Sequence, residues 1–452
     1  MHRLFGTDGV RGIANEALSC ERATQIGRAL GTVLSSRHKY RPKVLIGMDT
    51  RLSSPMLASA IAAGLCSAGS DVIGLGVVPT PAVAYLVGKY QAKAGVMISA
   101  SHNPFPYNGI KIFGDTGYKL SDELEELIES IVLDNTPPCR PAEADHIGHY
   151  ETKSNALQDY LSHVKATTNT SLSGMRLVID CANGAASATA RALFEGLGAE
   201  CTLLSDAPDG KNINDQCGST NMKALSACVV KTGAAVGLAF DGDADRFLAV
   251  DEKGNEVDGD FIMAILARHL KASGRLKGNT VVGTVMTNYG FTKFCEREDI
   301  RYIAAKVGDR YVLEMLNQEG YVFGGEQSGH IIFREFATTG DGQLTAVQLL
   351  SYMKESGRPL SELRRVMQKY PQCTVNVDAD PSDKINFFTD EEIGRILRDA
   401  EKEIGDSGRI VVRPSGTEPV IRVMVESESE EQTERIAKST AKAIEKRLAE
   451  YR

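Results

Sequence analysis

The stretch that decides the fold is Ala94-Gly-Val-Met-Ile-Ser-Ala-Ser-His-Asn-Pro104. Its apolar run, Gly95 to Ile98, predicts a buried strand, and the small polar residues after it predict a turn. Asn103-Pro104 ends the strand region, because the residue before a proline is disfavoured in helical conformation. Ser101 and His102 are therefore expected at the carboxyl end of a strand, where open α/β sheets bind ligands. A serine that only satisfies its own turn is the alternative interpretation.

Strands and helices alternate around this stretch and again in two later parts of the chain. This pattern predicts three βαβ-type units of similar size, each presenting a polar loop at its strand ends. The expected strands are residues 43–48, 71–75, 95–99 and 109–113, then 176–180, 200–204 and 234–240, then 279–285, 300–306 and 321–323.

Two parts of the chain do not follow this alternation of strands and helices. Residues 134–150 are rich in proline and polar groups and predict a linker. Residues 371–452 predict short strands and two helices, which indicates a smaller α+β domain that serves as a lid or clamp. The predicted class is α/β, with three similar βαβ-type domains followed by this C-terminal domain. The predicted boundaries are 1–150, 151–256, 257–369 and 370–452.

Charge and cysteine content narrow the function classes. The 452 residues include 51 basic and 59 acidic ones, a net charge of −8, which argues against a nucleic-acid partner. A phosphorylated ligand remains compatible, because a few clustered arginines bind phosphate within an acidic protein. Nine cysteines without a C-x-x-C pair favour reduced thiols over disulfides or zinc. With no signal-peptide core and no apolar run of eighteen residues, we expect a cytoplasmic protein without a membrane partner.

Asp241-Gly-Asp-Ala-Asp245 is the sharpest chemical signal in the chain. Three carboxylates at alternate positions after a buried strand can converge on one hard cation, and a phosphate among the ligands favours Mg²⁺. A calcium loop of the EF-hand type is rejected, although Glu252 falls at its twelfth position. The sixth position of that loop needs glycine and is Arg246 here. A solvated acidic turn is the remaining alternative.

A phosphorylated Ser101 would add a fourth oxygen ligand, and the cation would then neutralise charge that develops during phosphoryl transfer. Arg11 lies in a glycine-punctuated loop at residues 3–12 and, with Lys111 and Arg246, is a candidate charge stabiliser or proton carrier. His102 is a further candidate, although a histidine in a turn more often only donates or accepts a hydrogen bond.

Two later loops suit a sugar phosphate. Ser415-Gly-Thr417 can form a nest of backbone N–H groups, and Arg413 and Arg422 flank it, which is a combination that binds phosphate. Residues 325–330 place an acceptor, an amide and a hydroxyl between glycines, which suits sugar hydroxyls. Ordinary polar turns remain the alternative for both loops. The nucleotide P-loop, the dinucleotide fingerprint and the serine-esterase elbow are absent from the sequence.

Taken together, these stretches and their order along the chain resemble those of the α-D-phosphohexomutase family. The resemblance covers the whole chain. The resemblance implies four domains around a central cleft, which carry the phosphoserine, magnesium, sugar and phosphate sites in chain order. It implies that Ser101 carries a phosphoryl group and, with Asp241, Asp243 and Asp245, holds one Mg²⁺. It implies Ser101, Arg11 and Lys111 as catalytic residues, and His102 and Arg246 join them as candidates from the chemistry of their loops. The implied substrate-binding residues are Asp309, Glu326, Ser328, His330, Arg413, Ser415, Gly416, Thr417 and Arg422.

Residues 5–12, Gln327 and residues 338–341 are most similar to the bacterial branch of the family that acts on glucosamine phosphates. Tyr107 departs from relatives that often have aspartate there. The branch implies interconversion of glucosamine 6-phosphate and 1-phosphate, which feeds UDP-N-acetylglucosamine and cell-wall synthesis. A hexosamine or glucose 1,6-bisphosphate is then the intermediate or activator.

The resemblance allows a homodimer. The alternatives are a mutase of glucose or mannose phosphates, a phosphoserine-dependent sugar phosphatase, and a non-catalytic sensor of sugar phosphates.

Overall fold

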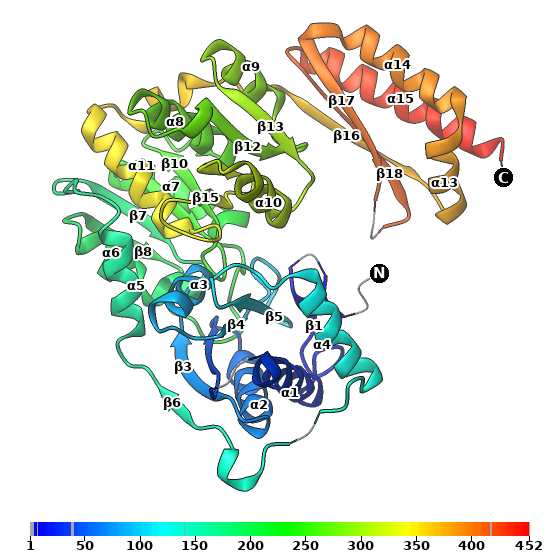
Figure 1. Cartoon of the computed structure of the whole chain (residues 1–452). Coiled ribbons are helices and arrows are strands. Elements are labelled where there is room, and N and C mark those ends of the chain that lie inside the picture. The colour runs from blue at the N-terminus through cyan, green and yellow to red at the C-terminus, as the bar shows by residue number, and fades with distance from the viewer. Residues whose placement is uncertain (1–3, 7, 38–39, 140, 416–417, 452) are drawn as a thin grey trace.

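The structure is a computed structural model that describes residues 4–6, 8–37, 40–139, 141–415 and 418–451. These residues form four sheets that follow one another along the chain (Figure 1). The strand orders are β1-β5-β4-β2-β3-β6, β11-β10-β9-β7-β8, β13-β12-β14-β15 and β16-β18-β17. We call these four parts the first, second, third and C-terminal units. Helices pack on every sheet, which confirms the predicted α/β class.

The first unit has a six-stranded sheet with buried inner strands. The strands are β1 (Val10–Ile13), β2 (Lys43–Met48), β3 (Asp71–Val77), β4 (Ala94–Ile98), β5 (Tyr107–Gly114) and β6 (Tyr150–Thr152). The helices are α1 (Cys20–Arg37), α2 (Ser54–Ser67), α3 (Thr80–Lys89) and α4 (Asp122–Asp134). Strand β2 pairs in parallel with β3 and with β4. The carboxyl ends of these three strands therefore meet at one edge.

Two stretches of the first unit differ from the sequence-based expectation. Residues 10–12, expected within the loop at residues 3–12, belong to β1 because Val10–Ile13 pairs with β5. The expected linker ends in β6, which pairs with β3 and so extends the first sheet to residue 152. Short segments such as these become strands because they form backbone hydrogen bonds with the exposed edge of a sheet. Their amino-acid composition gives no sign of this pairing.

The second and third units repeat parallel strands, with antiparallel hairpins at the end of each sheet. The second unit contains α5 (Ala156–Lys165), β7 (Arg176–Asp180), α6 (Ala190–Glu195), β8 (Glu200–Leu204), α7 (Lys223–Thr232), β9 (Val236–Phe240), β10 (Phe247–Asp251) and β11 (Glu256–Val257). The third contains α8 (Gly259–Ala272), β12 (Thr280–Thr284), α9 (Tyr289–Arg297), β13 (Arg301–Ala305), α10 (Asp309–Glu319), β14 (Phe323–Gly325), β15 (Ile331–Phe333), α11 (Gly342–Ser356) and α12 (Leu360–Leu363).

One apolar core joins these units. It runs from Leu45 and Met97 of the first sheet through Ile179 and Phe240 of the second to Phe323 of the third. Burial of this continuous surface holds the three units as one body. None of the described helices combines the length and the apolar character needed to cross a membrane.

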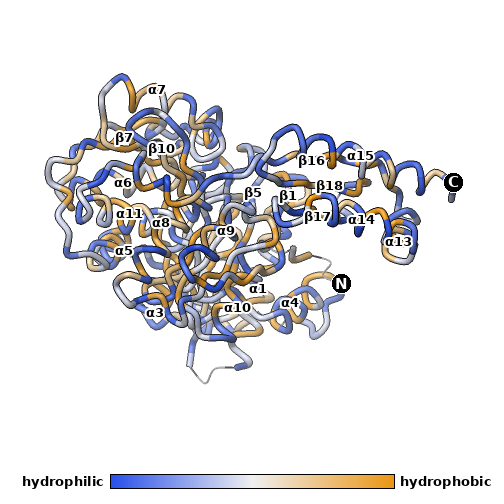
Figure 2. The backbone as a smooth tube through the Cα atoms, turned by 90° about the horizontal axis from the view of Figure 1, so that it is seen from above, coloured by the Kyte–Doolittle hydropathy of each residue, from blue (hydrophilic) through white to orange (hydrophobic). Residues whose placement is uncertain are grey.

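The C-terminal unit has a core of its own and stands off from this body (Figures 1 and 2). Its elements are β16 (Gln372–Asp378), α13 (Pro381–Thr389), α14 (Glu391–Ile404), β17 (Gly408–Pro414), β18 (Val420–Ser427) and α15 (Glu430–Ala449). The expectation of two helices is wrong, because α13 is a third helix. A capping box of Asp380 and Asp383 starts α13, and Asp390 caps the next helix separately.

Candidate active site

Ser101 lies in the loop after β4, residues 99–104, which we call the Ser101 loop. Its side chain is buried, and its φ of 52° lies in the left-handed region. Its Oγ donates a hydrogen bond to Asp241 Oδ2 at 2.6 Å, and His102 Nδ1 lies 3.3 Å from the same oxygen. The structure therefore brings together a hydroxyl and an acid that are 140 residues apart in the chain.

The acidic loop turns from β9 into β10. One carboxylate oxygen from each of Asp241, Asp243 and Asp245 lies within 4.8 Å of the others, and all three residues are buried. Within the described part of the chain, Asp243 Oδ1 and Asp245 Oδ1 have no hydrogen-bond partner. Burial together with the other two carboxylates raises the pKa of Asp241 well above its usual range. Two of the three acids thus keep a buried oxygen that accepts no hydrogen bond from the described residues, which suits a hard cation.

Two side chains from the first unit also contact these acids. Lys111 Nζ lies 3.0 Å from Asp243 Oδ2 and 3.3 Å from Asp245 Oδ2. Thr80 Oγ1 donates to Asp243 Oδ2 at 2.6 Å from the start of α3. Sequence reasoning predicted Lys111 but missed Thr80, whose only signal is its position after β3 and before a proline.

Lys111 also belongs to a closed ring of six side chains that alternate in sign, which we call the charge ring. Three members come from the first unit, one from the second and two from the third. In order they are Lys111, Asp8, Lys119, Asp309, His330 and Asp245, and successive N–O distances around the ring are 3.5, 3.2, 2.7, 3.8, 3.6 and 3.3 Å. The ring therefore ties the three units together at the acidic loop.

His102 of the Ser101 loop and His330 of the charge ring differ in charge. Burial lowers the pKa of His330, but its hydrogen bond to Asp245 and the charges of Asp245 and Asp309 raise it to about 9, so it is protonated in the ring. Burial lowers the pKa of His102 to about 4, with help from Arg246 and Arg11, so that side chain is neutral.

Arg11 and Arg246 lie beside the acids. Arg11 pairs with Asp8, and Arg246 Nε lies 4.0 Å from Asp245 Oδ1. The backbone N–H of Arg246 donates to Asp241 Oδ1 at 3.2 Å. Among the described residues, the Nε atom of each arginine is buried and has no hydrogen-bond acceptor. Both guanidinium groups therefore retain donors for an anion.

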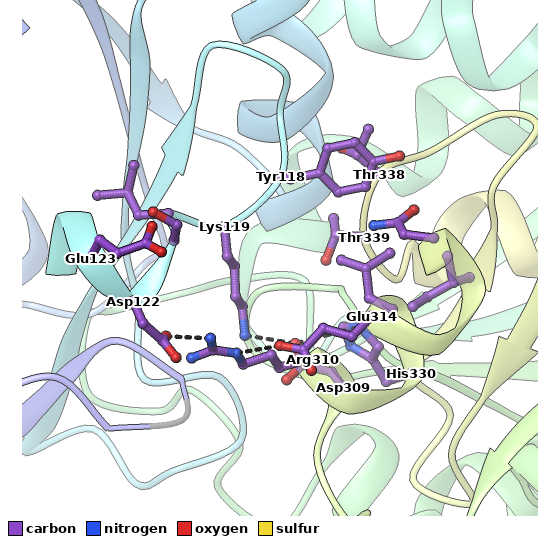
Figure 3. A pocket seen from close by; sticks show the side chains of 15 residues that line it. Tyr118, Lys119, Asp122, Glu123, Asp309, Arg310, Glu314, His330, Thr338 and Thr339 are labelled. Atoms are coloured by element: carbon purple, nitrogen blue, oxygen red, sulfur yellow. Dashed lines mark hydrogen bonds and ion pairs between the residues drawn. The ribbon is translucent and has the colours of Figure 1, made fainter. Parts of the chain in front are cut away.

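The predicted sugar loop connects β14 to β15. Glu326 Oε1 accepts from the backbone N–H of Gly308 at 3.1 Å, which links this loop to the start of α10. Ser328 Oγ is buried and lacks a partner in the described part of the chain. A pocket of about 340 Å³ lies beside the charge ring, and Figure 3 shows Lys119, Asp309 and His330 in its lining. The structure thus groups the predicted residues Asp309, Glu326 and His330.

The predicted phosphate loop lies on the hairpin of β17 and β18. Arg413 faces Arg422 directly across the two strands, and Arg422 pairs with Glu418. Lys384, which sequence reasoning missed, donates to the carbonyl oxygen of Ser415 at 2.6 Å. Two directly opposed arginines repel each other, which favours a bound anion. Gly416 and Thr417 lie outside the described residues. The hairpin is separate from the Ser101 loop in this arrangement (Figure 1).

Comparison with known proteins identifies the family. Models of four phosphoglucomutase/phosphomannomutase domains match in order: domain I at residues 2–138, domain II at 158–254, domain III at 258–370 and the C-terminal domain at 355–443. Together with a relative that is 51% identical over 99% of the chain, they decide the assignment. The chain belongs to the phosphoglucomutase/phosphomannomutase family.

Relatives of this family member include the phosphoglucosamine mutase of Acetivibrio thermocellus, 51% identical over 99% of this chain and 100% of the relative. The phosphoglucosamine mutase of Clostridium novyi is 50% identical over 99% of both chains. Among solved structures, a family protein of Burkholderia thailandensis has a TM-score of 0.83 at 24% identity and covers 99% of this chain and 98% of its own. A putative phosphomannomutase of Thermus thermophilus has a TM-score of 0.79 at 23% identity, covering 98% and 99%. These structures share the fold.

Proposed function

We propose that this family member is a phosphoglucosamine mutase, an isomerase that interconverts glucosamine 6-phosphate and glucosamine 1-phosphate. Relatives of that name, about 50% identical over the full chain, support the assignment. The observation that carries the chemistry is the 2.6 Å contact between the Ser101 hydroxyl and the buried acidic loop. A hydroxyl so placed is suited to carry a phosphoryl group.

Asp241, Asp243 and Asp245, with a phosphorylated Ser101, would hold one Mg²⁺, which neutralises charge on the transferring phosphoryl group. Two acid oxygens without hydrogen-bond partners in the described part of the chain support this fit. Arg11 and Arg246 would donate to the phosphoryl oxygens.

Each half-reaction moves one phosphoryl group. The free hydroxyl of the sugar monophosphate loses its proton as its oxygen bonds to phosphorus, while the bond between phosphorus and Ser101 Oγ breaks and that oxygen takes up a proton. The products are a 1,6-bisphosphate and the free Ser101 hydroxyl. The bisphosphate then reverses its orientation in the site, and Ser101 takes the phosphoryl group from the other end of the sugar. His102 Nδ1, 3.3 Å from Ser101 Oγ, is placed to exchange a proton with that oxygen. Lys111, held by Asp243 and Asp245, is a second candidate proton carrier.

The non-transferring phosphate needs a second site that serves both orientations of the sugar. The opposed pair of Arg413 and Arg422, with Ser415, Gly416 and Thr417, would supply it after the C-terminal unit closes. Asp309, Glu326, Ser328 and His330 would hold the sugar between the two phosphates. The predicted boundaries at 256 and 369 remain our proposal, and we move the first boundary from 150 to 152, because β6 belongs to the first sheet.

The test compares Mg²⁺-dependent isomerisation of glucosamine, glucose and mannose 6-phosphates, each started with its 1,6-bisphosphate. We expect the highest kcat/KM for glucosamine 6-phosphate, and no turnover by Ser101→Ala. Equal or faster turnover of glucose 6-phosphate would reject the glucosamine assignment. Release of inorganic phosphate in place of the isomer would indicate the phosphatase.

A further inference from the structure

Arg51 lies beneath the Ser101 loop at the end of β2, and its side chain is fully buried. Its Nη2 donates to the carbonyl oxygens of Ser101 and Asn103, each at 2.8 Å, and its Nη1 donates to that of Pro104 at 2.6 Å. Its Nε donates to Asp49 Oδ2 at 2.8 Å, which balances the buried charge. One guanidinium group thus holds three carbonyl oxygens of the loop in place.

Asn214, in the second unit, reaches the same loop from the other side. Its Nδ2 donates to the carbonyl oxygens of Ser101 at 2.9 Å and Asn103 at 3.1 Å. Its own backbone N–H donates to Ala182 at 2.9 Å, which fixes Asn214 to the end of β7. The Ser101 carbonyl oxygen therefore accepts hydrogen bonds from two different units.

The acidic loop also contacts this carbonyl group. A Cβ atom on Gly242 would lie only 2.5 Å from the Ser101 carbonyl oxygen, so the two backbones touch. Ser101 has a φ of 52°, in the left-handed region that non-glycine residues rarely adopt. Surrounding contacts must maintain such a conformation, and Arg51 and Asn214 supply them directly.

We propose that Arg51 and Asn214 are positioning residues for phosphoryl transfer. They fix the Ser101 carbonyl group from two units, so that the serine keeps the conformation that directs its Oγ to Asp241. The proposal rests on the proposed function, because it assigns these residues to the phosphoryl-carrying step. It also makes correct docking of the first and second units a condition for transfer, since each unit provides one of the two residues.

The test uses the full chain phosphorylated on Ser101 and measures single-turnover transfer to glucosamine 6-phosphate. In Arg51→Lys, one ammonium group cannot replace a planar guanidinium that spans three carbonyl oxygens. We expect transfer to slow by about 10–100-fold, since small displacements of a reacting group have effects of that size. The KM for glucosamine 6-phosphate should stay within about threefold, because neither residue contacts the predicted sugar loop.

Asn214→Ala provides the independent variant, should Arg51→Lys fail to fold. It should also slow transfer with little change in KM. Asn212→Ala is the matched control, because within the described part of the chain the Asn212 side chain forms its hydrogen bonds with Ala207 and Asp209 of its own loop and not with the Ser101 loop. Addition of guanidinium chloride to Arg51→Ala should restore part of the transfer rate, whereas urea should not.

Two outcomes would count against the proposal. Folded Arg51→Lys or Asn214→Ala with a wild-type transfer rate would overturn it. A rise in KM at an unchanged transfer rate would also do so, because it would place these residues in substrate binding. A wild-type chain that never accepts phosphate on Ser101 gives a different result, because it rejects the proposed function itself.

Discussion

Asp243 combines two environments on one carboxylate. Its Oδ2 accepts from Thr80 and Lys111, whereas its Oδ1 is buried and has no partner among the described residues. We expect Asp243→Asn to lower kcat by more than about 100-fold, because an amide is a much weaker ligand for a hard cation. Isomerase activity over a Mg²⁺ titration, with far-UV circular dichroism for folding, checks this.

Asp180→Asn is the matched control for that substitution. Asp180 is equally buried at a strand end of the same sheet, and its Oδ1 accepts a hydrogen bond from the backbone N–H of Ala182. An asparagine oxygen can accept the same bond, so activity should stay near the wild-type value. Full activity of Asp243→Asn in excess Mg²⁺ would contradict the metal assignment.

We expect the buried Asp341 carboxyl group to make the free energy of unfolding depend on pH. Burial raises its pKa from 3.8 to about 6, even though Leu344 N–H and Tyr160 OH donate to it. The folded state therefore binds the proton more tightly than the unfolded state, so this group makes the protein less stable as pH rises from about 4 to about 6. Asp341→Asn keeps the acceptor without the charge. At pH 7 it should be more stable by up to about 3 kcal/mol.

Urea unfolding of wild type and Asp341→Asn at pH 4 and pH 7 checks this prediction. Because the two proteins are compared at the same pH, the contributions of the other titrating groups to the free energy of unfolding largely cancel. The difference in the free energy of unfolding should grow from pH 4 to pH 7. A difference that is the same at both values would show that the carboxylate carries no burial penalty.

At the scale of elements, the contact between the acidic loop and the Ser101 loop depends on Gly242. We expect Gly242→Ala to separate the loops, because its Cβ would lie 2.5 Å from a backbone oxygen. Isomerase activity should fall at least tenfold. In Gly88→Ala the new Cβ meets nothing within 4 Å on the exposed face of α3, so activity should be unchanged and stability slightly raised. Wild-type activity in Gly242→Ala would show that the contact is dispensable.

Buried parallel strands were predictable because each is a short apolar run before a polar turn, as in β4 and β7. The hairpin strands β10 and β15 were not predicted, because each directly follows a predicted site loop whose polar residues dominate the local pattern. Site residues were likewise predictable only where the signal is local in the sequence. Ser101 and the three aspartates stand in dense local motifs, whereas Thr80, Asp8 and Lys119 meet them only through tertiary contacts.

At the scale of the whole molecule, a polar junction attaches the C-terminal unit to the third unit. Glu426 is fully buried there and accepts from Arg409 Nε at 2.7 Å, Tyr289 N–H at 2.9 Å and Asn288 Nδ2 at 3.1 Å. Arg409 also donates to the carbonyl oxygen of Thr287. No periodicity or motif in the sequence predicts this junction, because its members come from three separate stretches.

Arg409→Met should loosen the junction, because it leaves the buried Glu426 carboxylate without its cation. We expect faster hydrogen exchange at the start of β16 and β17, and changes in both kcat and KM for glucosamine 6-phosphate. Arg435→Met is the control, since it removes an exposed ion pair with Glu403 inside the C-terminal unit. Unchanged exchange and kinetics in Arg409→Met would show that other contacts fix the unit.

Because this junction lies near one end of β18, a small rotation there moves the other end of the C-terminal hairpin by a larger distance. Glu426 lies near one end of β18 and Val420 at the other, so six residues at about 3.3 Å each make an arm of about 20 Å. A swing of ten degrees about the Glu426 end would carry the far tip through an arc of about 3.5 Å, given that arm. A small angular change at a pivot remote from the substrate therefore becomes a displacement longer than a hydrogen bond at the far end of β18, beside the predicted phosphate loop.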